Sequence, residues 1–209
     1  MFSIIEAAGW PIWPLILCSI AALALVIERA MSLRRPKVVP KGLVQEVLGV
    51  HRQGALNDDV LGKLAANSVF GTVLAAGLRT HQADRQADEA VLRQSFELAG
   101  RTAAHQLERY LNTLGTIATA APLLGLLGTV VGMIEIFGAQ APGSGTNPAQ
   151  LAHGISIALY NTAFGLIVAI PSLVAHRFFR GRVNGFLVDM EQDAETLLQH
   201  LLRSAPRGR

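Results

Sequence analysis

Long apolar stretches without a charged side chain constrain this sequence more than any other feature. An α-helix rises 1.5 Å per residue, so roughly 20 apolar residues cross a hydrocarbon core of about 30 Å. Three stretches reach that length, and they run from Trp10 to Ile27, from Tyr110 to Ile134 and from Gly154 to Ala175. We therefore predict an all-α integral membrane protein with transmembrane helices at residues 10–33, 110–137 and 154–176.

The composition excludes several other classes of protein. Only 16% of the 209 residues are charged and 51% are hydrophobic, whereas soluble globular chains carry about 25% charged residues. The six histidines show no ligand spacing, and Gly62-Lys63 lacks the glycine that a P-loop needs five residues earlier. The one cysteine, Cys18, cannot form an intrachain disulfide. We expect no enzyme activity, no metal and no cofactor.

The basic residues predict the orientation of the helices. They flank the apolar stretches on one side, which favours a membrane topology over nucleic-acid binding, and the expected membrane-interface residues are Arg34, Arg35, Arg109, Arg177 and Arg180. By the positive-inside rule this side is cytoplasmic. A cleaved signal peptide would carry its positive charge before the apolar core, whereas here the charge follows it. The predicted order is a periplasmic N-terminus (1–9), a cytoplasmic helical region (34–109), a periplasmic loop (138–153) and a cytoplasmic tail helix (177–209).

The cytoplasmic region shows helical periodicity. Residues 42–50 and 58–78 read as helices, with Asn57 as the N-cap of the second. From Asp88 onward apolar residues recur every three or four positions without an intervening proline. We therefore expect one continuous helix from Asp88 into the second span.

The tail carries a heptad seam. Its members step by four and three residues, and they are Val183, Leu187, Met190, Ala194, Leu197 and Leu201. A seam of this kind packs either on its own neighbours in the chain or on other copies, as a cytoplasmic oligomer seam. The repeat alone does not separate these two alternatives.

Small residues line one face of each of the last two spans. In lipid, helices associate through close packing of small residues. The predicted packing residues are Gly125, Gly128, Gly132, Ala158, Gly165 and Ala169. The first span has no such stripe, so we expect it at the rim, facing lipid, while the other two line an interior.

Two threonines, Thr129 and Thr162, lie on these small-residue faces. Each hydroxyl either bonds back to its own helix or contributes to a shared polar pathway. No Asp, Glu, Lys, Arg or His lies near the middle of any span, whereas a proton relay through lipid needs a titrating group. If the chain conducts protons, the acid must come from another polypeptide.

Residues 121–137 (APLLGLLGTVVGMIEIF) and 154–171 (GISIALYNTAFGLIVAIP) resemble the two signature helices of the MotA/TolQ/ExbB proton channel family. Residues 67–77 (NSVFGTVLAAG) are similar to a third, less specific stretch of its members. Three spans with an external N-terminus resemble the ExbB and TolQ branch. The resemblance extends over essentially the whole chain.

The resemblance implies a homo-pentamer in the bacterial inner membrane, surrounded by membrane lipids, whose second and third helices ring a pore. It implies an ExbD-like partner, a dimer of single-span chains in the pore that carries the essential aspartate. Proton flow would then energise a TonB-like protein and outer-membrane uptake. Thr129 and Thr162 match the pore-facing threonines of the family. A TolQ-like role in envelope maintenance and a passive scaffold for partner helices are the alternatives.

The sequence departs from the family at one informative position. Many relatives carry a glutamate in the third helix where this chain has Ile157. Three readings follow: that carboxylate is dispensable, Glu135 compensates for it, or the chain uses a different partner. We favour dispensability, because the neighbouring Thr162 motif is intact. Arg177 also replaces an uncharged residue of some relatives.

Overall fold

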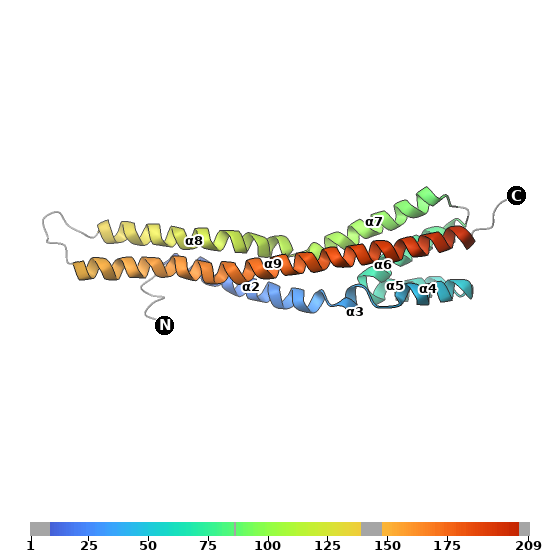
Figure 1. Ribbon diagram of the computed structural model, residues 1–209, viewed down its shortest axis with the longest axis horizontal. Helices are drawn as coiled ribbons and strands as arrows, with labels where there is room; N and C mark the ends of the chain where they lie inside the picture. Colours follow the sequence, from blue (N-terminus) through green and yellow to red (C-terminus); the bar gives the residue numbers. More distant parts are fainter. Residues whose placement is uncertain (1–8, 86, 139–147, 205–209) are drawn as a thin grey trace. The chain divides into compact units, whose positions relative to one another are not determined.

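The computed structural model describes residues 9–85, 87–138 and 148–204, and every regular element within them is a helix (Figure 1). Residues 1–8, most of the predicted loop (139–147) and residues 205–209 lie outside the described part. In chain order the helices are α2 (Ile12–Ser32), α3 (Arg35–Val38), α4 (Leu43–Arg52), α5 (Asp58–Asn67), α6 (Val69–Ala83), α7 (Glu89–Glu108), α8 (Leu111–Gly138) and α9 (Pro148–Ser204).

The chain divides into two compact units. The first, here called the span unit, contains residues 1–28 and 110–178, and the second, the loop-tail unit, contains residues 29–109 and 179–209. Three stretches of described helix are long and apolar enough to cross a membrane, namely Ile12–Ser32, Glu89–Gly138 and Leu151–Arg203. This confirms the prediction of an all-helical chain with three candidate membrane spans.

The second of these stretches is interrupted, so the predicted continuous helix from Asp88 is wrong. Between α7 and α8, Arg109 has an extended ψ of 136° and Tyr110 has a positive φ of 67°. Leu107 is buried in the loop-tail unit and Leu111 is buried in the span unit. In one straight helix, residues four apart lie on the same face. Because the helix is broken between α7 and α8, the side chains of Leu107 and Leu111 need not lie on one face.

The predicted helix at 58–78 is likewise divided in two, at Ser68. The Ser68 backbone is extended, and its hydroxyl accepts a hydrogen bond of 2.9 Å from the Gly71 backbone N–H, as an N-cap does. A Cβ on Gly71 would collide with the carbonyl oxygen of Leu64, so the glycine permits α5 and α6 to pack closely. Asn57 caps α5 as predicted, accepting a 2.9 Å hydrogen bond from the Val60 N–H.

Helix α9 is continuous over 57 residues and includes Pro171. The predicted third span and tail are therefore one helix, although it begins six residues before the predicted span, at Pro148. Proline suits the first turn of a helix because its missing N–H would have no intrahelical partner there.

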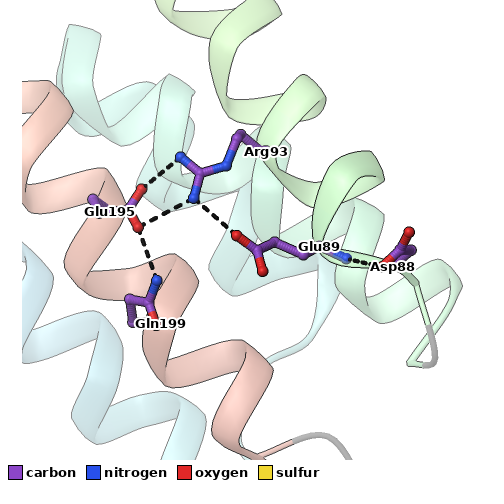
Figure 2. A network of polar contacts seen from close by, with 5 residues as sticks. All are labelled: Asp88, Glu89, Arg93, Glu195 and Gln199. Carbon is purple, nitrogen blue, oxygen red and sulfur yellow. Dashed lines mark hydrogen bonds and ion pairs between the residues drawn. The ribbon is translucent and has the colours of Figure 1, made fainter.

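The loop-tail unit packs α9 against the helices of the 29–109 segment. Arg93 of α7 donates to both carboxylate oxygens of Glu195 on α9, at 2.9 and 3.3 Å, and also to Glu89 at 3.0 Å (Figure 2). The Gln199 amide donates to the same Glu195 carboxylate at 2.9 Å. Because the Arg93 and Glu195 side chains are about half exposed, the network fixes the orientation of α7 against α9 more than it adds stability.

A buried arginine ties α2 to α7 in this unit. Only 4% of Arg29 is exposed, and its guanidinium donates to the Leu107 carbonyl at 3.2 Å. This carbonyl lies in the last turn of α7, where backbone acceptors have no intrahelical donor. Arg29 therefore satisfies a backbone acceptor at the C-terminal end of α7.

Candidate functional site

The span unit holds α8 and α9 in close contact through glycines. A Cβ on Gly165 would lie 2.6 Å from the Ala121 carbonyl oxygen, and one on Gly125 would lie 2.8 Å from the Asn161 carbonyl oxygen. Real Cβ atoms do not approach backbone so closely, so both positions require glycine at this spacing. The two helices therefore meet backbone to backbone, as small-residue stripes permit.

The stripe continues in both directions. A Cβ on Gly128 would lie 2.7 Å from the Asn161 Cβ, and a Cβ on Gly132 would lie 3.0 Å from the Ala158 Cβ. Ala158 and Ala169 are both buried. The structure thus places five of the six predicted packing residues in direct opposition along one contact, with Ala169 buried further along α9.

The two predicted pore threonines have different surroundings in the structure. The Thr162 Oγ1 is buried and has no hydrogen-bond partner among the described residues, and the Thr162 Cα lies 3.0 Å from the position of a Cβ on Gly125. Thr129 lies on a different face of α8, in a shallow apolar groove with Met133 and Phe137. Its hydroxyl donates to the Leu126 carbonyl of its own helix at 2.7 Å. The hydroxyl of Thr129 therefore bonds back to its own helix, whereas the hydroxyl of Thr162 does not.

A small cavity of about 120 Å³ lies in the span unit between the ends of α8 and α9. Its polar lining consists of the Glu135 side chain and Asn161, which is only 1% exposed. Ile157, at the position of the missing family glutamate, lines the same cavity. Sequence reasoning did not single out Asn161, although an amide within an uncharged apolar stretch was a visible signal.

The predicted seam residues lie in the core of the loop-tail unit. Five of the six are buried and Leu187 is half-buried, so the single chain covers them and the seam packs on its own neighbours. Their role as a cytoplasmic oligomer seam remains a prediction.

The predicted interface arginines Arg34, Arg35, Arg109, Arg177 and Arg180 are exposed. Of these, Arg35 pairs with Asp189 at 2.9 Å.

Sequence reasoning missed a histidine cluster in the loop-tail unit. The His51 ring on α4 lies 5.8 Å from the His81 ring on α6 and 5.4 Å from the His200 ring on α9, measured between centroids. Burial lowers the pKa of each ring below its ordinary value of 6.5, and neighbouring cationic groups lower it further. These histidines are far apart in sequence, so no local pattern indicates the cluster. Within the described residues no group of three or more His, Cys, Asp or Glu is arranged to hold a metal ion.

Comparison with known proteins places these features in a family. Residues 65–192 match the MotA/TolQ/ExbB proton channel family, and this segment contains α6, α7 and α8 and most of α9. The chain is 32% identical over 170 residues to biopolymer transport protein exbB1 of Vibrio cholerae, covering 80% of this chain and 74% of the relative. It is 33% identical over 176 residues to putative biopolymer transport protein ExbB-like 3 of Synechocystis, covering 83% and 82%.

A TolQ protein is also similar, over a shorter segment. The Tol-Pal system protein TolQ of Haemophilus influenzae is 34% identical over 118 residues, which cover 55% of this chain and 50% of the relative. The exbB1 protein of Vibrio cholerae and the ExbB-like 3 protein of Synechocystis align over a greater length, and the family match covers more than half of the chain. On these grounds the chain is a member of the MotA/TolQ/ExbB proton channel family.

Proposed function

We propose that this chain is the channel-forming subunit of a bacterial inner-membrane complex that uses proton-motive force to energise outer-membrane uptake. Five copies would surround the single-span helices of an ExbD-like dimer, whose carboxylic acid carries the proton, and a TonB-like protein would receive the work. Membership of the proton channel family and the ExbB-named relatives support this role. The chain would have its N-terminus in the periplasm and its C-terminus in the cytoplasm.

The buried Thr162 hydroxyl carries the proposal. An unpaired hydroxyl in a low-dielectric site costs free energy, and an incoming carboxyl or water would remove that cost. Thr162 therefore hydrogen-bonds the partner acid, or the waters that reach it, during the protonation cycle. Because each proton releases about 2.3 kcal/mol per 100 mV, repeated passages supply the work.

The test replaces the hydroxyl without changing the size of the side chain. Thr162→Val, co-expressed with an ExbD-like single-span partner, should assemble normally and lose energised uptake and proton flux in proteoliposomes. Thr162→Ser restores the hydroxyl and should recover much of both. Full flux in the valine variant would refute the role of Thr162, and the mass of the intact complex would report its stoichiometry.

The second candidate is a TolQ-like role in envelope maintenance, which the similarity to the Haemophilus influenzae TolQ protein favours. It involves the same channel chemistry and a different periplasmic client. Deletion of the gene distinguishes the two roles, since loss of iron-chelate uptake indicates the ExbB-like role and outer-membrane leakage indicates the TolQ-like role. If the threonine substitutions change neither uptake nor proton flux, the chain acts as a passive scaffold.

A further inference from the structure

The cavity at the ends of α8 and α9 contains an ionisable group that the proposed function does not use. Glu135 is the only ionisable residue among those that line it. The other lining residues are the apolar side chains and glycines of both helices, Pro11 before α2, and the Asn161 amide. Elsewhere between Tyr110 and Ile134 and between Gly154 and Ala175 the sequence has no acidic or basic residue.

Small residues create the space for this cavity. Gly132, Gly154 and Ala158 contribute to its wall and leave room that larger side chains would fill. Its volume of about 120 Å³ holds several waters, each of which occupies about 30 Å³ in the liquid. The carboxylate of Glu135, an exposed residue, and the buried Asn161 amide can supply hydrogen bonds for such waters, so the cavity suits water.

The cavity is also adjacent to the Thr162 region. Asn161 lines the cavity, its amide nitrogen lies 2.9 Å from the position that a Cβ on Gly128 would take, and Thr162 follows it on α9. The amide of Asn161 both donates and accepts hydrogen bonds. Asn161 therefore links the cavity to the turn of α9 that carries Thr162, and as a positioning residue it would orient the cavity waters.

We propose that Glu135 and its cavity form a proton-loading site on the side of the membrane where α8 ends and α9 begins. The inference rests on the proposed function and adds a residue to it. The Glu135 carboxylate accepts a proton from hydronium, leaving a neutral carboxyl group and one water. It then releases that proton, through the cavity waters, to the ionised acid of the partner, and becomes a carboxylate again. In the proposed orientation this side is periplasmic, where the proton supply is.

The test compares variants in proteoliposomes that contain the chain with its single-span partner. Glu135→Gln should assemble normally and lower proton flux by about tenfold or more, in line with the loss of a positioned proton-transfer group. It should also remove the step in the pH profile of flux that protonation of this carboxylate produces at the α8–α9 loop side. Glu135→Asp should retain both. Glu108→Gln removes an exposed glutamate at the end of α7 and should leave both unchanged.

A relocation variant sharpens the test, because Ile157 lines the same cavity. Glu135→Gln with Ile157→Glu returns one carboxylate to the cavity from the opposite helix and should recover flux and its pH dependence. Glu135→Gln with Ile157→Gln places an uncharged group there and should not. Recovery by the amide would show that shape alone matters, and would overturn the proposal.

The outcomes separate this inference from the proposed function. If the unsubstituted complex conducts protons and Glu135→Gln conducts equally well at every loop-side pH, the loading site is refuted and the channel role stands. If the unsubstituted complex carries no proton flux with its partner present, the channel role itself fails. Native mass of each variant complex separates loss of flux from loss of assembly.

Discussion

The span unit and the loop-tail unit bury their apolar side chains in different ways. In the loop-tail unit, Leu197 and Leu201 are 0% exposed within the single chain, and ion pairs occupy the surface. In the span unit, Ile134 of α8 and Ile167 of α9 are about two-thirds exposed. The loop-tail unit has a complete core of its own. The span unit leaves apolar faces exposed, and exposed hydrophobic surface of this kind generally marks a face that lipid or other helices cover.

The two units also differ in what a helix contact consists of. Within the loop-tail unit large side chains interdigitate, and a glycine there, Gly77, makes room for the Phe96 ring. In the span unit the contact of α8 with α9 is backbone against backbone at Gly125 and Gly165. Water drives the first kind of packing by the hydrophobic effect, whereas lipid does not, so the second depends on close fit.

The largest effect should follow from breaking the close fit. Gly165→Leu places a branched side chain where even a Cβ meets the Ala121 carbonyl oxygen. Overpacking of this kind costs typically 1–3 kcal/mol or more, and here the helices must separate. We expect loss of the folded complex, measured by size-exclusion chromatography and native mass. Gly181→Leu, on the same helix with nothing within 4 Å of its Cβ position, should assemble normally, and equal assembly of both variants would contradict the close-fit account.

A core truncation in the loop-tail unit should have the next largest effect. Leu197→Ala removes a fully buried side chain and should cost about 3 kcal/mol, within the usual range for such cavities. Val188→Ala, at an exposed position of the same helix, should cost far less. Thermal unfolding of the full chain in detergent, followed by circular dichroism, measures both. A melting temperature for Leu197→Ala as high as that of Val188→Ala would show that this core depends on other copies.

Sequence patterns predicted the helices whose signals are local. Apolar length predicted the three candidate spans, Asn57 predicted a cap, and the Gly-x-x-x-Gly spacing of Gly128 and Gly132 predicted a contact face. The break at Arg109–Tyr110 was not predictable, because no glycine or proline marks it and it follows from packing on either side. The division at Ser68 had a capping residue as its signal, which the helical periodicity around it obscured.

Site residues were predictable to the extent that their chemistry is local. Thr162 was found from its neighbours in α9, but its unsatisfied hydroxyl depends on what α8 presents to it. Glu135 and Asn161 line the same cavity although they are 26 positions apart in the sequence. No pattern within either helix predicts that cavity. The histidine cluster brings together three helices in the same way. Contacts made only by tertiary packing are therefore what the sequence left unresolved.

The smallest expected effect is a pH response confined to the loop-tail unit. Burial is the largest cause that lowers the pKa of His51, His81 and His200 below 6.5 in the folded chain. Arg85 acts on His51 and His81, while Arg52 and Arg203 act on His200. Asp84 opposes the shift at His81. Protonated rings would repel one another and these arginines, so the cluster is neutral in the packed state.

The sign of this response follows from linkage. Below about pH 6.5 the unfolded chain takes up protons on these rings before the folded chain does. The stability that the cluster contributes is therefore present above pH 6.5 and is lost as the pH falls through the folded pKa values. The shifted carboxylates Glu195 and Asp193 have ordinary values of 4.5 and 3.8, so a comparison between pH 7.5 and 5.5 mainly reports the histidines.

Hydrogen exchange on the full chain checks this prediction. Lowering the pH from 7.5 to 5.5, after correction for the intrinsic exchange rate, should weaken protection in α4, α6 and the last turns of α9 by less than Leu197→Ala weakens it. The contact of Gly125 on α8 with Gly165 on α9 should keep its protection, because the atoms nearest to these two glycines belong to no titrating ring. Replacing the three clustered histidines by asparagine should remove the response, whereas replacing the exposed His105 should not. If protection falls equally at the glycine contact, the response belongs to the whole chain and the two units are not independent in stability.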